Sequence, residues 1–156
     1  MDVATNLGGR LRNTLNRRQN DARYAQRQGR RLPVVDPDRV VIMGLSEGGL
    51  TTATRRPQKG EVARIIEGWT CQAGWSEYKG MNASASTPVL ALVGSKDPWH
   101  QNKWTRGNCT RNLRSSNGSR SVVYTSGTLA AEHELLDHAQ PKQDVIRFLT
   151  QIGLIQ

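Results

Sequence analysis

Ser46 lies in a stretch whose residue types and spacing are those of a serine nucleophile on a sharp turn. Residues 40–49 read VVIMGLSEGG, an apolar run that ends in Gly44-x-Ser46-x-Gly48. In this pattern the serine stands between a buried strand and a helix, and small residues two positions before and after it prevent clashes. We therefore predict that Ser46 attacks an electrophilic carbonyl and that Gly49 lets the helix pack closely. The alternative is a plain strand-turn-helix corner, because the pattern is short and the chain is rich in glycine.

Asp97 is the acidic residue that such a serine requires. It follows a second apolar run, PVLALVGSKD at residues 88–97, and therefore stands at the carboxyl end of a predicted strand. Open α/β sheets gather their functional groups at that end, and the partners of an elbow serine follow in the order acid, histidine. The alternative role for Asp97 is that of a turn aspartate before Pro98.

Three histidines are candidates for the general base: His100, His133 and His138. A further strand is predicted at residues 121–125 and a helix at about 141–152, and His133 lies in the loop between them. The elbow topology places the base in such a loop. We therefore favour His133, with His138 as the runner-up, whereas His100 follows the acid too closely to fill the third place.

The apolar runs together predict a single α/β domain with a mostly parallel sheet of about four strands. The strands are expected at residues 40–44, 63–69, 88–93 and 121–125. A helix is expected at residues 10–29, with an apolar stripe formed by Leu11, Leu15, Ala22 and Ala25. We divide the domain into a basic N-terminal helix, residues 1–31, that packs on the remainder, residues 32–156.

The order of Ser46, Asp97 and His133 resembles that of the α/β-hydrolase superfamily, and within it the dienelactone hydrolase-like esterases. The likeness covers about residues 10–155 and is carried by Val34–Val40, Val93–Trp99, and His133 with the helix Asp144–Leu149. It implies ester hydrolysis with Ser46 as nucleophile, His133 as general base and acid, and Asp97 orienting the histidine, without a cofactor or metal. Dienelactone hydrolases proper carry a cysteine at the elbow, so the serine indicates a general ester hydrolase.

The chain departs from that family before the elbow. Several strands should precede the elbow strand, but only about 39 residues do so, and they read as one helix. The backbone N–H of Glu47 is available for an oxyanion hole, whereas the second donor should come from a loop that this chain lacks. Loss of one donor typically lowers the rate about 100- to 1,000-fold. The alternatives are therefore a weak or silent hydrolase fragment, or an oligopeptidase-like serine peptidase.

The absence of the strands that should precede the elbow leaves the predicted elbow strand at the edge of the sheet. Without them, Val40, Val41 and Ile42 form an unpaired apolar strand edge, which is a template for pairing with another chain. We therefore expect either a truncated gene product or a homodimer that covers this edge.

The positive charge is concentrated at the start of the chain. The sequence has 22 Lys plus Arg against 13 Asp plus Glu, and residues 1–31 hold eight Arg and two Asp. A basic helix is able to bind nucleic acid or an anionic membrane. We instead expect a solvated helix face, because no recognition motif accompanies the arginines and Tyr24 is the only aromatic residue there. The expected partner is a small-molecule ester, with no nucleic acid and no membrane.

Cys71 and Cys109 lack metal-ligand spacing, so no zinc site is predicted from them. A disulfide between them and two free thiols both remain open. The first residues lack a secretory signal and no run of 18 apolar residues occurs, so the chain as written reads as cytoplasmic. A Cys71–Cys109 disulfide together with a truncated start would instead suit an exported enzyme.

Overall fold

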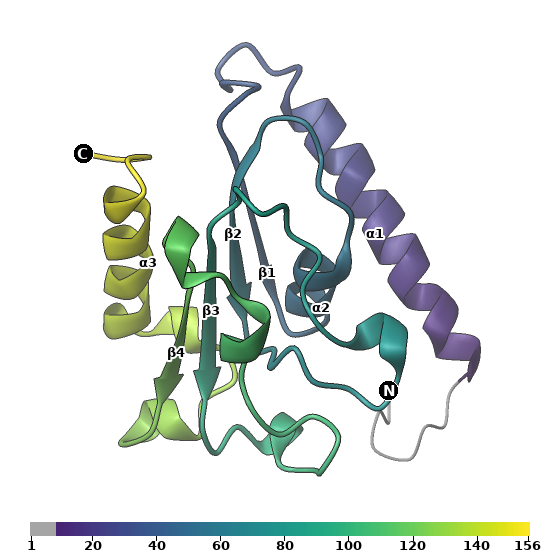
Figure 1. Ribbon diagram of the computed structural model, residues 1–156, viewed down its shortest axis with the longest axis vertical. Helices are drawn as coiled ribbons and strands as arrows, with labels where there is room; N and C mark the ends of the chain where they lie inside the picture. Colours follow the sequence, from purple (N-terminus) through teal and green to yellow (C-terminus); the bar gives the residue numbers. More distant parts are fainter. Residues whose placement is uncertain (1–8) are drawn as a thin grey trace.

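The computed structural model describes residues 9–156, and side chains from residue 13 onward. The described residues have an α/β fold built on one sheet of four parallel strands, as predicted (Figure 1). In spatial order these are β1 (Val40–Leu45), β2 (Glu61–Glu67), β3 (Val89–Gly94) and β4 (Arg120–Tyr124). The second strand begins and ends earlier than predicted, so that residues 68 and 69 belong to the loop after it. All four strands end at the same edge of the sheet, where their loops meet.

In residues 9–156, three α-helices flank this sheet. Helices α1 (Gly9–Gly29) and α2 (Glu47–Thr54) lie on one side of it, and α3 (Ala139–Gln151) lies on the other (Figure 1). Helix α2 packs directly on β1 and β2, and α1 packs on α2. The loops between these elements contain only short 3₁₀ turns.

The core is divided between the two faces of the sheet because successive side chains of a strand point to opposite sides. In β2, Ile66 packs in the cluster beneath α1 and α2, while its neighbour Ile65 packs in the cluster beneath α3. In β3, Ala91 and Leu90 divide in the same way. All six residues of β3 are buried, as the continuous apolar run of residues 88–93 indicates.

The apolar stripe predicted for the first helix is only partly correct. Leu15 is buried and Ala22 is half-buried, but Ala25 is exposed and Gln26 is buried instead. The side chain of Leu11 lies outside the described residues, as do residues 1–8 of the predicted N-terminal segment. The buried face therefore includes a polar residue that a search for apolar spacing does not detect.

Polar contacts explain this difference. The Oε1 atom of Gln26 accepts a hydrogen bond from Arg55 Nη1 at 3.0 Å, and Gln19 Nε2 donates to Thr54 Oγ1, also at 3.0 Å. Both partners lie at the end of α2, so the two helices are joined by hydrogen bonds as well as by Leu15. Arg17 and Arg27 project from α1 into solvent, as the charge pattern predicts.

The strand β1 is an edge strand: among the described residues it pairs only with β2. Two of its apolar side chains are notably accessible, Met43 at 57% and Leu45 at 36%. The predicted open edge is therefore present. No helix in the described part of the chain has the length and apolar character needed to cross a membrane.

Candidate active site

Ser46 occupies the corner between β1 and α2 and has a left-handed backbone, with φ 57° and ψ −115°. A non-glycine residue adopts such angles only where the surrounding structure enforces them, and such strain concentrates at functional sites. Gly44 contributes to this corner, because a Cβ atom there would overlap the carbonyl group of Gly48 and lie 2.8 Å from Thr52 Oγ1. The residue types around Ser46 thus permit a turn that projects the serine from the end of the strand.

The two glycines that follow Ser46 are not equivalent. A Cβ atom at Gly49 would lie 2.7 Å from the carbonyl oxygen of Glu67, so Gly49 does let α2 approach β2 closely. A Cβ atom at Gly48 would meet no described atom within 4 Å. The prediction that a side chain at Gly48 would collide is therefore wrong, because nothing in the described structure packs against that side of the helix.

The first amides of α2 lie next to the serine. The N–H of Ser46 donates to the carbonyl of Glu67 at 2.9 Å and so ties the corner to the end of β2. The N–H of Glu47, at the first position of the helix, has no partner among residues 9–156 and is available to an incoming oxyanion. The Glu47 side chain points elsewhere and forms a surface ion pair with Arg18 at 3.1 Å.

Asp97 caps a turn, as its position before Pro98 allows, and also has an oxygen left for a second partner. Its Oδ1 atom accepts a hydrogen bond from the N–H of Trp99 at 3.0 Å and caps the 3₁₀ turn Pro98–His100. Its Oδ2 atom remains for other partners, and the residue is fully buried. The turn therefore fixes the carboxylate so that one oxygen faces the loop that carries His133.

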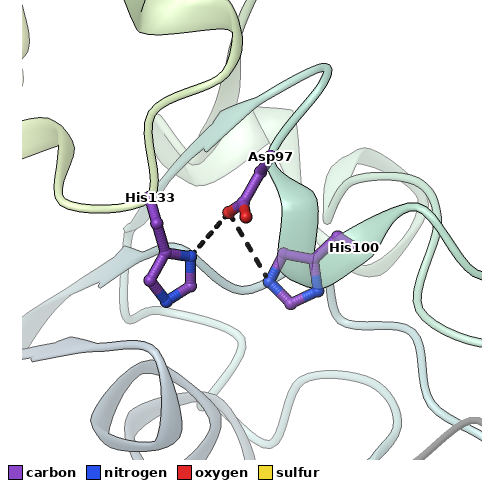
Figure 2. Close-up of side chains that lie close together, drawn as sticks. All are labelled: Asp97, His100 and His133. Carbon is purple, nitrogen blue, oxygen red and sulfur yellow. Dashed lines mark hydrogen bonds and ion pairs between the residues drawn. The ribbon is translucent and has the colours of Figure 1, made fainter.

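His133 binds that oxygen: its Nδ1 atom lies 2.6 Å from Asp97 Oδ2 (Figure 2). The His133 side chain is 15% exposed, and its ring rests against Gly68, where a Cβ atom would lie 2.9 Å from His133 Cε1. Gly68 also has a φ of +58°. Only glycine suits both its backbone angle and the space left by the imidazole.

The other two histidines have different environments. His138, the runner-up, lies 3.2 Å from Glu132 Oε2 and makes no contact with Asp97. His100 is buried on the other side of the Asp97 carboxylate, with Nε2 3.9 Å from Oδ2 and 2.9 Å from the Gly68 carbonyl. Burial lowers the pKa of His100 and so favours the neutral ring, although the Gly68 carbonyl and Asp97 oppose this shift.

Sequence reasoning missed Glu67, the last residue of β2. Its carbonyl oxygen accepts from Ser46, and its buried Oε1 atom accepts from the N–H of Leu136 at 2.6 Å. Burial raises the pKa of Glu67, while the Leu136 hydrogen bond lowers it. Glu67 thus connects the serine corner with the loop that carries His133.

Ser46 and His133 are both adjacent to the end of β2, one at Glu67 and the other at Gly68. In the described structure the Ser46 hydroxyl makes no hydrogen bond to His133. Catalytic hydrogen bonds are often long before substrate binds and shorten in the Michaelis complex. The structure therefore brings Asp97 and His133 into direct contact and places Ser46 at the same end of the sheet.

A disulfide joins Cys71 and Cys109, so of the two alternatives the bonded one is present. The bond links the loop after β2 to the loop after β3, and a hydrogen bond of 2.5 Å from Thr70 Oγ1 to the Thr105 carbonyl reinforces the link. The first loop begins with Gly68, beneath His133, and the second contains Asp97. The disulfide therefore supports the part of the sheet edge where the site lies.

The structure also brings together three potential metal ligands that the spacing of residues in the sequence does not indicate as a group. Asp97, His100 and His133 each offer a metal-ligating atom, and these atoms lie within 4.8 Å of one another. The spacing Asp97-x-x-His100 is the one sequence signal for this cluster, because the two residues span a single 3₁₀ turn that brings residues three apart onto one side.

Comparisons of the chain with protein-family models, with curated proteins and with solved structures found no match. The α/β fold is therefore established by the structure of this chain, and the resemblance to α/β-hydrolases remains a hypothesis based on its residues.

Proposed function

We propose that the protein is a serine hydrolase of the α/β-hydrolase type that hydrolyses a carboxylic ester. The main support is the hydrogen bond of 2.6 Å between His133 Nδ1 and Asp97 Oδ2. It leaves Nε2 as the free nitrogen of His133, at the same sheet edge as a serine with a strained backbone. A buried acid that orients a histidine next to such a serine is the arrangement that activates a hydroxyl nucleophile.

In this proposal the Oγ atom of Ser46 attacks the ester carbonyl while Nε2 of His133 accepts the hydroxyl proton. The C–O bond to the alcohol then breaks, and His133 returns the proton to the leaving alcohol. Water, deprotonated by the same nitrogen, then attacks the acyl-serine. The bond between the acyl carbon and Ser46 Oγ breaks, His133 returns the proton to Oγ, and the acid is released. Asp97 keeps the proton on Nδ1 and stabilises the imidazolium that forms in each step.

The oxyanion that develops on the carbonyl would accept a hydrogen bond from the Glu47 N–H. Among the described residues we identify no second donor, and one missing donor lowers the rate about 100- to 1,000-fold. We therefore propose slow turnover. A catalytically silent fragment would have the same fold, and an oligopeptidase-like peptidase would use the same residues on an amide.

We further propose that a second copy of the chain covers the open edge of β1. Such a homodimer is favoured by the exposed side chains of Met43 and Leu45 and by the backbone edge of β1, which pairs with no strand in residues 9–156 other than β2. The substrate is proposed to be a small-molecule ester.

The decisive experiment is labelling of the purified protein with a fluorophosphonate probe, located by mass spectrometry. Ser46→Ala and His133→Ala should abolish labelling, because the first removes the nucleophile and the second its base. Ser95→Ala is the matched control, since Ser95 is an exposed serine in the loop after β3. Folded wild-type protein that stays unlabelled, or that labels at another serine, would refute the proposed chemistry.

Substrate class is tested with matched p-nitrophenyl ester and p-nitroanilide substrates that share one acyl group. Faster release from the ester supports an esterase. Comparable release from both would favour the peptidase alternative, because esters are intrinsically the easier substrates.

A further inference from the structure

His100 is the group that the proposed hydrolase mechanism does not use. Its side chain is only 7% exposed, and it comes from the same 3₁₀ turn as Asp97. Its Nε2 atom has one firm partner, the Gly68 carbonyl at 2.9 Å, and its buried Nδ1 atom has none among the described residues. One hydrogen bond, from Nε2 to the Gly68 carbonyl, therefore holds the ring, and a ligand on Nε2 would replace that single bond.

The geometry of the cluster is close to that of a metal site. Figure 2 shows Asp97 between His100 and His133, with one carboxylate oxygen facing both rings. The His133 and His100 nitrogens lie 2.6 and 3.9 Å from that oxygen. A tetrahedral ion with bonds of about 2.0–2.1 Å requires ligand atoms roughly 3.3 Å apart. Relative to that oxygen, His133 would have to withdraw and His100 to approach, each by roughly 0.7 Å, and their two nitrogens, which lie within 4.8 Å of each other, would have to approach to about 3.3 Å.

The chemistry of the three ligands selects the ion. Two imidazole nitrogens and one carboxylate oxygen suit Zn²⁺ and its neighbours in the first transition row, and suit Ca²⁺ or Mg²⁺ poorly. The carboxylate would supply one negative charge, and its second oxygen is already held by the N–H of Trp99. Such support of a ligating carboxylate is typical of protein metal sites.

We propose that Asp97, His100 and His133 form a binding site for Zn²⁺ or a similar divalent transition-metal ion, and that the bound ion inhibits the hydrolase chemistry proposed for Ser46. The first half of this proposal depends only on the cluster. The second half rests on the proposed function.

Inhibition follows from the change of tautomer that a metal ion would impose on the two histidine rings. In the metal-free site, His133 carries its proton on Nδ1, toward Asp97, and accepts the serine proton at Nε2. A metal ion on Nδ1 displaces that proton, and the neutral ring then carries it on Nε2. In His100 the proton moves likewise from Nε2 to Nδ1. The ion thus breaks the Asp97–His133 hydrogen bond and blocks the nitrogen that would act as base, without a net release of protons.

Binding is tested with ZnCl₂ by calorimetry and with CoCl₂ by its visible absorption, both in the Ser46→Ala background so that hydrolysis has no influence. We expect one ion per chain. His100→Gln removes a ligand but keeps a donor that reaches toward the Gly68 carbonyl, and it should weaken binding by roughly 10- to 100-fold or more. His138→Gln is the matched control, because His138 lies outside the cluster, and it should bind as the parent does.

His133→Gln in the same background is a second test in case the buried His100 variant does not fold. His133 is more accessible, and its replacement should weaken binding to a similar extent. Absence of binding to the folded parent, or equal binding by parent and both cluster variants, would overturn the proposed site.

Regulation is tested separately by the rate of fluorophosphonate labelling in protein with Ser46 intact. Zn²⁺ should slow labelling of the wild type, and the same inhibition in His100→Gln should require at least about tenfold more Zn²⁺. If the protein binds Zn²⁺ but Ser46 is not labelled even in the absence of Zn²⁺, the proposed function is refuted and the metal site is supported. Binding that leaves labelling unchanged would refute inhibition alone.

Discussion

His133 Nδ1 and Asp97 Oδ2 are joined by a hydrogen bond of 2.6 Å although 36 positions separate the two residues in the chain. The bond is possible because β3 and β4 are parallel neighbours, so that the loops that follow them leave the same edge of the sheet. Asp97 comes from the first of these loops and His133 from the second. The fold, rather than proximity in sequence, thus creates the pair on which the proposed function depends.

Replacing Asp97 with asparagine tests this pair. The amide would favour the wrong tautomer of His133, and we expect labelling of Ser46 to slow by about 10⁴-fold, the effect of this change in a serine protease triad. The rate of fluorophosphonate labelling measures it. Asp38→Asn, at an exposed aspartate, is the control and should label at the wild-type rate. Equal rates for the two variants would exclude an orienting role for Asp97.

Two glycine variants test the corner that holds Ser46. Gly44→Ala forces a methyl group against the Gly48 carbonyl, and overpacking of this kind typically costs about 1–3 kcal/mol. Gly48→Ala meets open space in a helix, where alanine is favoured by about 0.5–1 kcal/mol. Urea unfolding should therefore show a less stable Gly44→Ala and an unchanged or more stable Gly48→Ala. The opposite order would mean that the corner is built differently.

The parts of the molecule that sequence predicts are those with a local signal. The strands follow from continuous apolar runs, and Ser46 and Asp97 follow because each stands where such a run ends. His133 is favoured over His138 by its place in the loop before the last helix. The long stretch of residues 9–29 also has enough helical pattern to be predicted nearly to the residue.

The features that the sequence does not predict depend on contacts between distant segments of the chain. Glu67 reads as the end of a strand, and only the fold shows that it meets Ser46 and Leu136. Chain order argues against His100 as the third member of the site, although a single turn brings it close to Asp97. The predicted clash at Gly48 and the predicted burial of Ala25 are wrong for a related reason. Each prediction requires a packing neighbour that the described structure does not place there.

The Cys71–Cys109 disulfide closes a segment of 38 residues. Chain entropy alone predicts that such a bond raises the free energy of unfolding by about 4 kcal/mol. We expect the double variant Cys71→Ala/Cys109→Ala to lose stability of this order in urea, and wild type in dithiothreitol to match it. Reducing agent should not affect the double variant. If wild type is equally stable oxidised and reduced, the bond contributes no stability.

Glu67 should make stability depend on pH. Because burial raises its pKa in the folded chain, its contribution to stability is fully present below the pKa of the unfolded carboxyl group, about 4.3, and is lost as pH rises through the folded pKa. Nearby Asp137 and Glu134 reinforce the shift, whereas His133 and the Leu136 N–H oppose it.

Glu67→Gln removes this titration while keeping an oxygen that accepts from Leu136. Urea unfolding between pH 4 and pH 8 should show that the variant gains stability over wild type as pH rises. Asp38→Asn, at an exposed aspartate that does not contribute to the Glu67 shift, should follow the wild-type profile closely. Parallel profiles for wild type and Glu67→Gln would show that the carboxyl group titrates alike in the folded and unfolded chains.

The edge of β1 is tested by placing a charge on it. Met43 is 57% exposed on the edge strand, and lysine at such a position discourages pairing with another chain. Ile146→Lys provides a matched control, because Ile146 is 54% exposed on α3, away from that edge. If a second copy covers β1, sedimentation should show a dimer for wild type and Ile146→Lys and a shift to monomer for Met43→Lys. A wild type that stays monomeric at all concentrations would refute the homodimer, and equal dissociation of both variants would locate the interface elsewhere.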